Sequence, residues 1–403
     1  MQTLLATDED EPLPVIGESR FGHELDGHGQ ERRNAWMLSS MQYHGRSGTV
    51  WASADESVSC RDDRVSEYST CHDCKGESMV AKNETTVTSA IIVRPLRESD
   101  LAAADEIMRV AFGTFIGLPE PRAFMGDAAF IEPRWRSNPA GAFAAEVDGT
   151  VIGSNIATRW GSFGFFGPLT VRPDLWDRGI GKRLLEPVMD SFTSWGVTHA
   201  GLFTFPHSEK HVGLYQRFGF WPRFLTAIMA KRVTPEQQPI ARDWSEFSRS
   251  PREQRADLLR ACRDLTDVVY DGLDLSQEIE AVADLDLGET VLLWSGDRLA
   301  GLAVCHFGAA TEGGSGSCYL KFATVRPGGS GAADFIRMLS ACEALARERG
   351  MTSLVGGTNL ARVEAYKLMR EHGFRTTMQG VAMQRPNEEG YNRTNVYVID
   401  DWR

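Results

Sequence analysis

The chain has 403 residues, of which 42% are hydrophobic and 24% charged, and its formal net charge is −12. Its length indicates two or three domains. No apolar run approaches the roughly 18 residues of a membrane span, and the N-terminus lacks the basic and then apolar pattern of a secretory signal. Residues 1–87 carry −8 and the remainder −4, with no basic stripe, so we expect neither a membrane nor a nucleic-acid partner. Seven cysteines, an odd number, favour reduced thiols in a cytoplasm over a disulfide framework.

Residues 1–87 are polar and acidic and show no sustained hydrophobic periodicity. Such a composition predicts a largely disordered extension. Within it, Cys60 and the run Cys71-His72-Asp73-Cys74 resemble half of a zinc site. A structural zinc needs a second pair of ligands, and none follows, so we predict no metal site.

Residues 88–232 alternate between strand and helix patterns. Asp148-Gly149 separates two strands and is a strong signal for a two-residue hairpin turn. Ser99 is a suitable N-cap for the first helix. The patterns predict strands at 91–96, 142–147, 150–160, 163–171, 200–205 and 220–233, and helices at 98–112, 179–195 and 209–218.

The order of elements then recurs. Residues 233–288 form a mostly helical region that begins with the linker TPEQQP, and residues 289–403 repeat the strand and helix order and close on a strand within NVYVIDDWR. Val-Arg-Pro occurs at 171–173 and 325–327, and Gly-Phe at 219–220 and 373–374. We interpret this as an internal duplication of roughly 145 residues. The predicted fold class is mixed α/β (α+β), with two tandem domains, each a mostly antiparallel sheet flanked by helices.

The stretch DLWDRGIGKRLL places glycine and positive charge where a helix begins. The first amides of a helix lack intrahelical partners, and the helix dipole adds positive potential there, so anions bind such ends. Gly179 and Gly181 allow close backbone approach, and Arg178 and Lys182 add charge. The spacing fits neither the P-loop motif nor the dinucleotide fingerprint.

Together with Val171-Arg172-Pro173, Leu184-Leu185 and LYQRFGF at 214–220, this loop resembles the GNAT superfamily of acetyl-CoA-dependent N-acetyltransferases. The resemblance covers about residues 90–232 and, more faintly, 289–386. It implies that acetyl-CoA is the co-substrate and that the loop holds its pyrophosphate, although Trp176 and Asp177 depart from the usual Q/R-x-x-G-x-G/A pattern. It also implies that the preceding strand splays from its neighbour and pairs with the pantetheine arm. The implied coenzyme-binding residues are Leu169, Thr170, Val171, Arg178, Gly179, Ile180, Gly181 and Lys182.

Acetyl transfer from a thioester to an amine needs a base, an oxyanion donor and an acid for the departing thiolate. A backbone amide within Leu169–Val171 suits the oxyanion. Tyr215 matches the position of the family's frequent general acid, and the alternative is a tyrosine packed against the sheet. His207 is the candidate base because histidine is the usual general base at neutral pH and this one follows the predicted strand at 200–205. Glu146, Glu209 and His211 are rivals, and His207 could equally be a surface or packing residue.

The acceptor site is expected in the segment between the first helix and the next strand. Its aromatic side chains could line a pocket or belong to the core; they are Phe112, Phe115, Phe124, Phe130 and Trp135. In the second copy the loop is shorter and has no Arg or Lys before Arg337, and Tyr366 lies at a different spacing from Gly373 than Tyr215 does from Gly219. We therefore predict that this copy is degenerate, without efficient coenzyme binding, and serves the sheet, the acceptor pocket or a homodimer.

The leading hypothesis is an acetyl-CoA-dependent N-acyltransferase acting on a small primary amine or a protein amino group. A second hypothesis compares the active and degenerate tandem to mycothiol synthase, which acetylates a cysteinyl amine. A third is a non-catalytic, CoA-binding regulatory protein. The residues alone leave all three open.

Overall fold

The computed structural model describes residues 90–234 and 243–403, and every structural statement below concerns these residues. The predicted extension at 1–87, with Cys60, Cys71, His72 and Cys74, lies outside them, as does most of the TPEQQP linker.

The first half follows the predicted order closely. Its elements are β1 (Ile92–Pro95), α1 (Leu101–Phe115), α2 (Ile131–Ser137), β2 (Ala142–Val147), β3 (Thr150–Trp160), β4 (Phe163–Phe166), β5 (Thr170–Val171), α3 (Ile180–Ser194), β6 (His199–Thr204), α4 (Glu209–Gln216) and β7 (Trp221–Arg232). Asp148 and Gly149 have φ values of 48° and 75°, which confirms the predicted tight hairpin turn.

The second half opens with a strand and two helices and then repeats the first. Its elements are β8 (Trp244–Glu246), α5 (Arg252–Val269), α6 (Ser276–Asp284), β9 (Gly288–Ser295), β10 (Arg298–Gly308), β11 (Gly314–Val325), α7 (Gly331–Glu348), β12 (Ser353–Asn359), α8 (Val363–Glu371), β13 (Arg375–Arg385) and β14 (Val398–Ile399).

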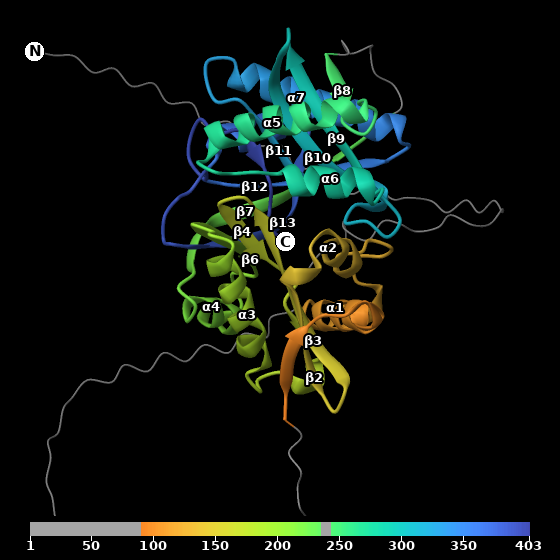
Figure 1. The fold of residues 1–403 in the computed structure, drawn as a ribbon, viewed down its shortest axis with the longest axis vertical. Helices are drawn as coiled ribbons and strands as arrows, with labels where there is room; N and C mark the ends of the chain where they lie inside the picture. The colour runs from red at the N-terminus through yellow and green to blue at the C-terminus, as the bar shows by residue number, and fades with distance from the viewer. Residues whose placement is uncertain (1–89, 235–242) are drawn as a thin grey trace, which may run out of the picture. The chain divides into compact units, whose positions relative to one another are not determined.

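One mixed sheet runs through both halves in the order β1-β2-β3-β4-β6-β13-β7-β12-β11-β10-β9-β8. The last long strand of each half is exchanged: β13 lies between β6 and β7, and β7 lies between β13 and β12 (Figure 1). Neither half therefore completes its own sheet, and hydrogen bonding along the strands couples them.

The two halves repeat in register as well as in order. Val171 of β5 lies opposite Gly153 of β3, and Val325 of β11 lies opposite Gly301 of β10. The next amide also matches, because Arg172 donates to the Ile152 carbonyl at 2.9 Å and its counterpart Arg326 donates to the Ala300 carbonyl at 2.8 Å. The predicted mixed α/β fold with two similar tandem halves is confirmed.

Three predicted boundaries are wrong. The first helix begins at Leu101 rather than 98, because residues 98–100 form a separate 3-10 turn and Asp100, not Ser99, is the N-cap. The strand predicted at 163–171 is broken into β4 and β5 at Gly167-Pro168, where Gly167 has a φ of 148°. The closing strand in NVYVIDDWR has only two residues, and they pair with β11.

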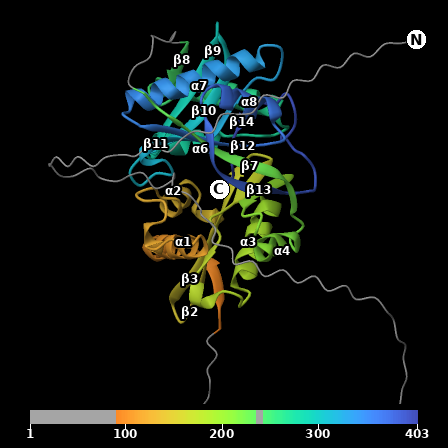
Figure 2. The same ribbon diagram turned by 180° about the vertical axis from the view of Figure 1, so that it is seen from behind.

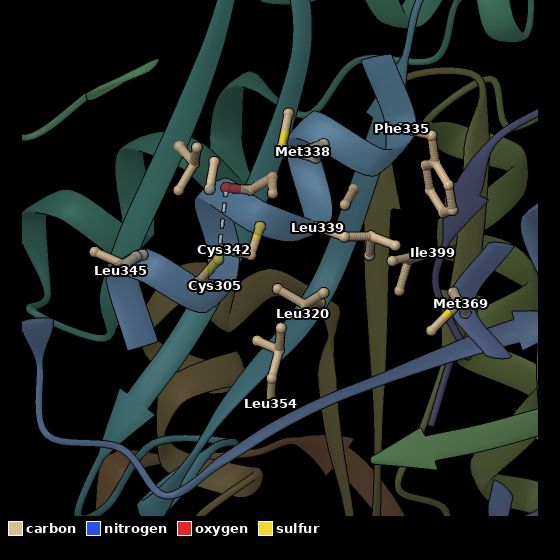
Figure 3. Packing of buried hydrophobic residues seen from close by; sticks show 14 of the residues in the cluster. Cys305, Leu320, Phe335, Met338, Leu339, Cys342, Leu345, Leu354, Met369 and Ile399 are labelled. Atoms are coloured by element: carbon tan, nitrogen blue, oxygen red, sulfur yellow. Dashed lines mark hydrogen bonds between the residues drawn. The ribbon is translucent and has the colours of Figure 1, made fainter. Parts of the chain in front are cut away.

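Helices cover both faces of each half-sheet. In the first half α1 and α2 lie on one face and α3 and α4 on the other (Figures 1 and 2). In the second half α7 and α8 pack against one face and α5 and α6 against the other. Figure 3 shows the packing beneath α7, where Cys305 and Cys342 lie among leucines and methionines.

The four cysteines within the described ranges are buried free thiols: Cys262, Cys305, Cys318 and Cys342. Across residues 90–234 and 243–403, no three His, Cys, Asp or Glu side chains are grouped so that they could hold a metal ion. A search of the same residues for membrane spans found no helix both long and apolar enough to cross a bilayer.

Candidate active site

The chain separates two neighbouring strands in the middle of the first half. β4 pairs in parallel with β6 from Phe163–His199 to Phe165–Gly201. At Gly167 the chain turns away, and β5 then pairs only with β3. The result is a V between β5 and β6, with its tip near Gly201.

The edge of β5 that faces this V carries unshared backbone groups. Arg172 bonds to Ile152 on β3, and successive residues of a strand direct their amides to opposite edges. The amides of Leu169 and Val171 are therefore directed away from β3, into the V. The Val171 carbonyl on this edge accepts a hydrogen bond from the Trp176 indole at 2.8 Å. Trp176, which departs from the usual loop pattern, thus anchors the loop to β5.

The loop ends at the N-terminus of α3. Gly179 is the N-cap with a φ of 75°, a conformation that side chains other than glycine rarely adopt, and no atom lies within 4 Å of where its Cβ would stand. Arg178 and Lys182 are exposed, and no carboxylate among the described residues pairs with either. Two neighbouring cations are already paired, Arg172 with Asp174 at 2.6 Å and Lys210 with Asp177 at 2.7 Å. Arg178 and Lys182 thus remain available for an anion.

Tyr215 on α4 lies against Phe166, the last residue of β4. Its side chain is buried and packs on Phe166 with ring centroids 5.7 Å apart, and the side chain of Thr204 at the end of β6 lies nearby. Burial raises the pKa of the Tyr215 hydroxyl well above its ordinary value, despite the opposing effect of Thr204. The phenol therefore keeps its proton throughout the neutral range, as a general acid must.

His207 lies in a different group, at the end of the same strand. Its ring stacks on Phe115 at 5.8 Å and contacts Phe205, and His211 contacts Phe115 at 5.0 Å. Burial, with the nearby His207 and Lys210, lowers the pKa of His211 and so favours its neutral form. Two candidate bases thus share one aromatic cluster with the end of α1.

The aromatic segment divides between that cluster and the core. Phe112 stacks on Phe124 at 5.2 Å and approaches Phe205 at 6.5 Å, so both belong with the histidines. Phe130 is buried in the core, and the Trp135 indole donates to the Leu96 carbonyl. The aromatic cluster is defined here as Phe112, Phe115, Phe124, Phe205, His207 and His211.

The carboxylate rivals for the base lie elsewhere. Glu146 is paired with Arg94 at 2.6 Å, at the β1–β2 edge of the sheet. Glu209 is exposed in the first turn of α4, where it complements the helix dipole.

One residue of the site region was not predicted. Arg134 on α2 is buried, donates to the Gly167 carbonyl at 2.8 Å, and makes a two-point ion pair with Glu312 at 2.7 and 2.9 Å. Arg134 thus ties the break between β4 and β5 to the second half. The Pro168 that interrupts FGFFGPLTV was the one signal of this break, because proline is rare inside a central strand.

The counterpart site in the second half differs in chemistry. Met369 lies four residues before Gly373, as Tyr215 does before Gly219, so a thioether replaces the phenol. Asp334 stands in the first turn of α7, and Arg337 is paired with Asp243 and Asp334 at 2.5 and 2.6 Å. Neither the acid nor the free cations of the first half recur.

The first half thus combines a V between two parallel strands with a glycine-bounded helix N-terminus at its mouth, and this arrangement is suited to an extended anionic ligand. Residues 101–220 match the family model described as Acetyltransferase (GNAT) family. Over these residues the first half of the chain therefore resembles the GNAT acetyltransferases. A search of curated proteins found no match.

Two solved structures with TM-scores above 0.5 share the fold over both halves. A putative acetyltransferase from Pyrococcus horikoshii aligns with a TM-score of 0.56 at 14% identity, over 77% of this chain and 95% of that chain. A GCN5-related glucosamine N-acetyltransferase region of a fungal multi-domain GH3 β-N-acetylglucosaminidase aligns with a TM-score of 0.51 at 12% identity, over 74% of this chain and 38% of that one. A tandem GNAT protein from the clavulanic acid biosynthesis pathway aligns over 73% of this chain and 98% of that one, at 11% identity with a TM-score of 0.46. At these identities the likeness to the first two structures concerns the fold alone.

Proposed function

We propose that the protein is an acetyl-CoA-dependent N-acyltransferase that transfers an acetyl group to a primary amine by direct attack on the thioester. The observation that carries this proposal is the unpaired edge of β5, which leads directly to the open N-terminus of α3. We assign the active domain to residues 88–232, a helical linker region and the start of the second domain to 233–288, and a degenerate copy to 289–403. A cytoplasmic location belongs to the same proposal.

The residues fit an extended phosphate-bearing thiol ester. The amides of Leu169 and Val171 offer strand-like donors to the amide groups of a pantetheine arm, while Thr170 between them directs its backbone to β3. The amides that start α3, from Gly179 to Lys182, would face the pyrophosphate, with Arg178 beside them. Space above Gly179 is consistent with close approach of a ligand.

The thioester supplies the acyl group when bound, and residues of the chain supply the oxyanion donor, the general acid and the general base. The Val171 or Leu169 amide donates to the carbonyl oxygen as negative charge develops on it. The Tyr215 hydroxyl donates its proton at the sulfur when the carbon–sulfur bond breaks. His207 accepts the proton that the attacking amine releases, directly or through a water, with the neutral His211 as the rival.

The acceptor binds beside the aromatic cluster in this proposal. Phe112, Phe115 and Phe124 present apolar surface at the end of α1, and the two histidines lie at its rim. An amine with an apolar body suits such a surface. A cysteinyl amine, as in mycothiol synthesis, and a protein amino group are further acceptors for an assay panel.

Calorimetric titration of acetyl-CoA into the intact protein and two matched variants tests the coenzyme site. A Cβ at Gly181 would meet only Leu214, at an ordinary 3.5 Å, so Gly181→Ala is expected to bind within a few-fold of the parent. Gly181→Asp adds a carboxylate where an anion must bind, and we expect affinity to fall by more than about tenfold.

Equal binding by all three proteins would place the coenzyme elsewhere. No binding by the parent would withdraw the acyltransferase proposal. Binding without turnover of any amine in a broad panel would favour a regulatory, CoA-responsive protein.

A further inference from the structure

The second half contains the same V as the first, built in the same register. β11 pairs in parallel with β12 from Ser317–Ser353 to Leu320–Gly356, then diverges while it stays paired with β10 through Val325. Because Arg326 bonds to Ala300 as Arg172 does to Ile152, the amides of Ala323 and Val325 are directed into this second V.

Unlike the first V, the second is filled by the chain itself. β14 pairs antiparallel with the exposed edge of β11, with Ile399 opposite Ala323 and Val398 opposite Thr324. The opposite side of the segment bonds to β12, where the Asp400 amide donates to the Gly357 carbonyl at 2.9 Å. The Thr358 hydroxyl also contacts the Val398 carbonyl, at 3.4 Å. The terminal segment therefore bridges both arms of the V.

The same segment covers the helix N-terminus at the mouth of the second V. The Tyr397 ring lies against the first residue of α7, since a Cβ on Gly331 would be only 2.8 Å from Cε2 of that ring. Tyr397 also packs on Phe335, with centroids 5.6 Å apart. An aromatic side chain thus occupies the place that the first half leaves open beside Gly179.

The surrounding strands are shaped to receive the segment. Gly356 on β12 has no room for a side chain, because a Cβ there would lie 2.7 Å from Ile399. Figure 3 shows Ile399 among Phe335, Leu339 and Met369 in the core of the second half. Residues 396–402 are all buried.

Specific polar contacts fix the segment in place. Asp400 pairs with the fully buried Arg362 at 2.5 Å and accepts from the Tyr391 hydroxyl at 2.6 Å. Asp401 accepts from the Tyr319 hydroxyl at 2.9 Å. A buried ion pair of this kind depends on its geometry, so the segment has one register in the V.

We propose that the C-terminal segment Asn395–Arg403 is a built-in replacement for the coenzyme in the second half: it takes the positions that the pantetheine arm and the pyrophosphate take in the first half. The comparison of the two clefts rests on the proposed function of the first. The chain then binds one coenzyme, and the second half is held closed by its own terminus.

The consequence extends to the first half. Beyond the V, the Trp402 ring packs directly against Gly201, because a Cβ on Gly201 would lie 2.6 Å from that ring. The Trp402 ring also contacts Phe163, with ring centroids 5.0 Å apart. The Arg403 carbonyl accepts a hydrogen bond from Arg134. The segment that fills the second V therefore supports the tip of the first.

Hydrogen exchange followed by mass spectrometry on the intact chain, with and without saturating acetyl-CoA, tests the proposal. We expect peptides covering 169–183 to slow on adding acetyl-CoA, while those covering 320–326 and 395–403 exchange slowly in both states. Calorimetry is expected to give one site. Faster exchange at 395–403 on adding coenzyme, or two sites, would overturn the proposal.

A second experiment uses a chain ending at Thr394 and does not depend on coenzyme binding. The synthetic peptide NVYVIDDWR, added in trans, is expected to bind it and to slow exchange at 320–326 and 354–358 by more than about tenfold. The same peptide with Ile399→Asp is the control and is expected to have no effect. If exchange at these strands in the shortened chain equals that of the intact chain, the segment does not occupy the V.

The two experiments distinguish failure of the proposed function from failure of the proposal for residues 395–403. If the intact chain binds no acetyl-CoA but 395–403 is protected and the peptide rescues the shortened chain, the proposed function fails and the inserted segment stands. If the shortened chain does not fold, rescue by the parent peptide and not by its control supports the insertion, and the intact-chain exchange still decides it.

Discussion

At the scale of single residues, the role of the Tyr215 side chain is the central question. Its position before Gly219 predicts a general acid, and a packed tyrosine is the competing interpretation. In the structure the residue is buried and packed on Phe166, as a packing residue would be, and burial keeps its hydroxyl protonated, as a general acid requires. Only a measurement of turnover separates them.

Tyr215→Phe removes the proton donor and keeps the packing. We expect kcat to fall by about 100-fold or more, while acetyl-CoA affinity stays within about twofold, because general acid catalysis typically contributes 10²–10⁴. Thiol release in steady state and calorimetry measure the two quantities. An unchanged kcat would leave Tyr215 a packing residue.

The pH dependence of the parent follows from the same burial. Because the pKa of Tyr215 is raised well above its ordinary value of 10.0, the hydroxyl stays protonated as pH rises. We therefore expect kcat, measured at saturating substrates from pH 7 to 9.5, to show no decline on the alkaline side. A decline over this range that is absent in Tyr215→Phe would mean that the phenol titrates in the assay and is not buried during turnover.

At the scale of elements, the break between β4 and β5 matters more than either strand alone. A continuous strand from 163 to 171 would pair with β6 along its whole length and leave no V. Gly167 and Pro168 turn the chain, Arg134 holds the turned carbonyl, and the amides of Leu169 and Val171 face the gap. The exposed helix start at Gly179 then lies at the mouth of that gap.

The exchanged strands predict mutual dependence of the halves. A fragment of residues 90–234 retains β7 but lacks β13, which separates β7 from β6, so both strands would expose unpaired edges. We expect this fragment alone to lack a cooperative thermal transition and to regain one when coexpressed with residues 243–403. Circular dichroism on heating tests this, and a cooperative, coenzyme-binding isolated fragment would contradict it.

At the scale of the whole molecule, a buried charge network joins the halves. Glu312 contacts both Arg134 and Lys321, and Lys321 also pairs with Glu278 at 2.8 Å. Burial alone would raise the pKa of Glu278, but Lys321 and then His306 outweigh it and lower it from 4.5 to about 2. The pKa of Glu312 is lowered as well, by Arg134 and Lys321 against its burial.

Because these folded-state pKa values lie below the unfolded ones, the carboxylates stabilise the protein above pH about 4.5, and this contribution is lost as pH falls toward 2. Glu312→Gln leaves Arg134 and Lys321 without their shared anion. We expect the free energy of unfolding at pH 7 to fall by about 3–5 kcal/mol and its dependence on pH between 5 and 2 to weaken. Urea unfolding across this pH range is the measurement, with the exposed Glu132→Gln as control. A variant as stable as the parent would show that the network contributes little.

Much of this protein could be predicted from its sequence, because the decisive signals are local. Hydrophobic periodicity places most strands and helices, Asp148-Gly149 sets a hairpin, and the glycines before Leu184 mark a helix that starts at Ile180. The repeated Val-Arg-Pro indicates the tandem halves, which the matching registers of Val171 and Val325 confirm.

What only the tertiary structure decided depends on contacts between distant residues. No local pattern links Arg134 to Glu312, inserts β13 between β6 and β7, or seats residues 395–403 in the second V, since each pairs segments from opposite halves or from far apart in the chain. The terminal run NVYVIDDWR predicts a strand, and its alternation is correct for one. Its place depends on distant residues: Gly356 of β12 makes room for Ile399, and buried Arg362 pairs with Asp400.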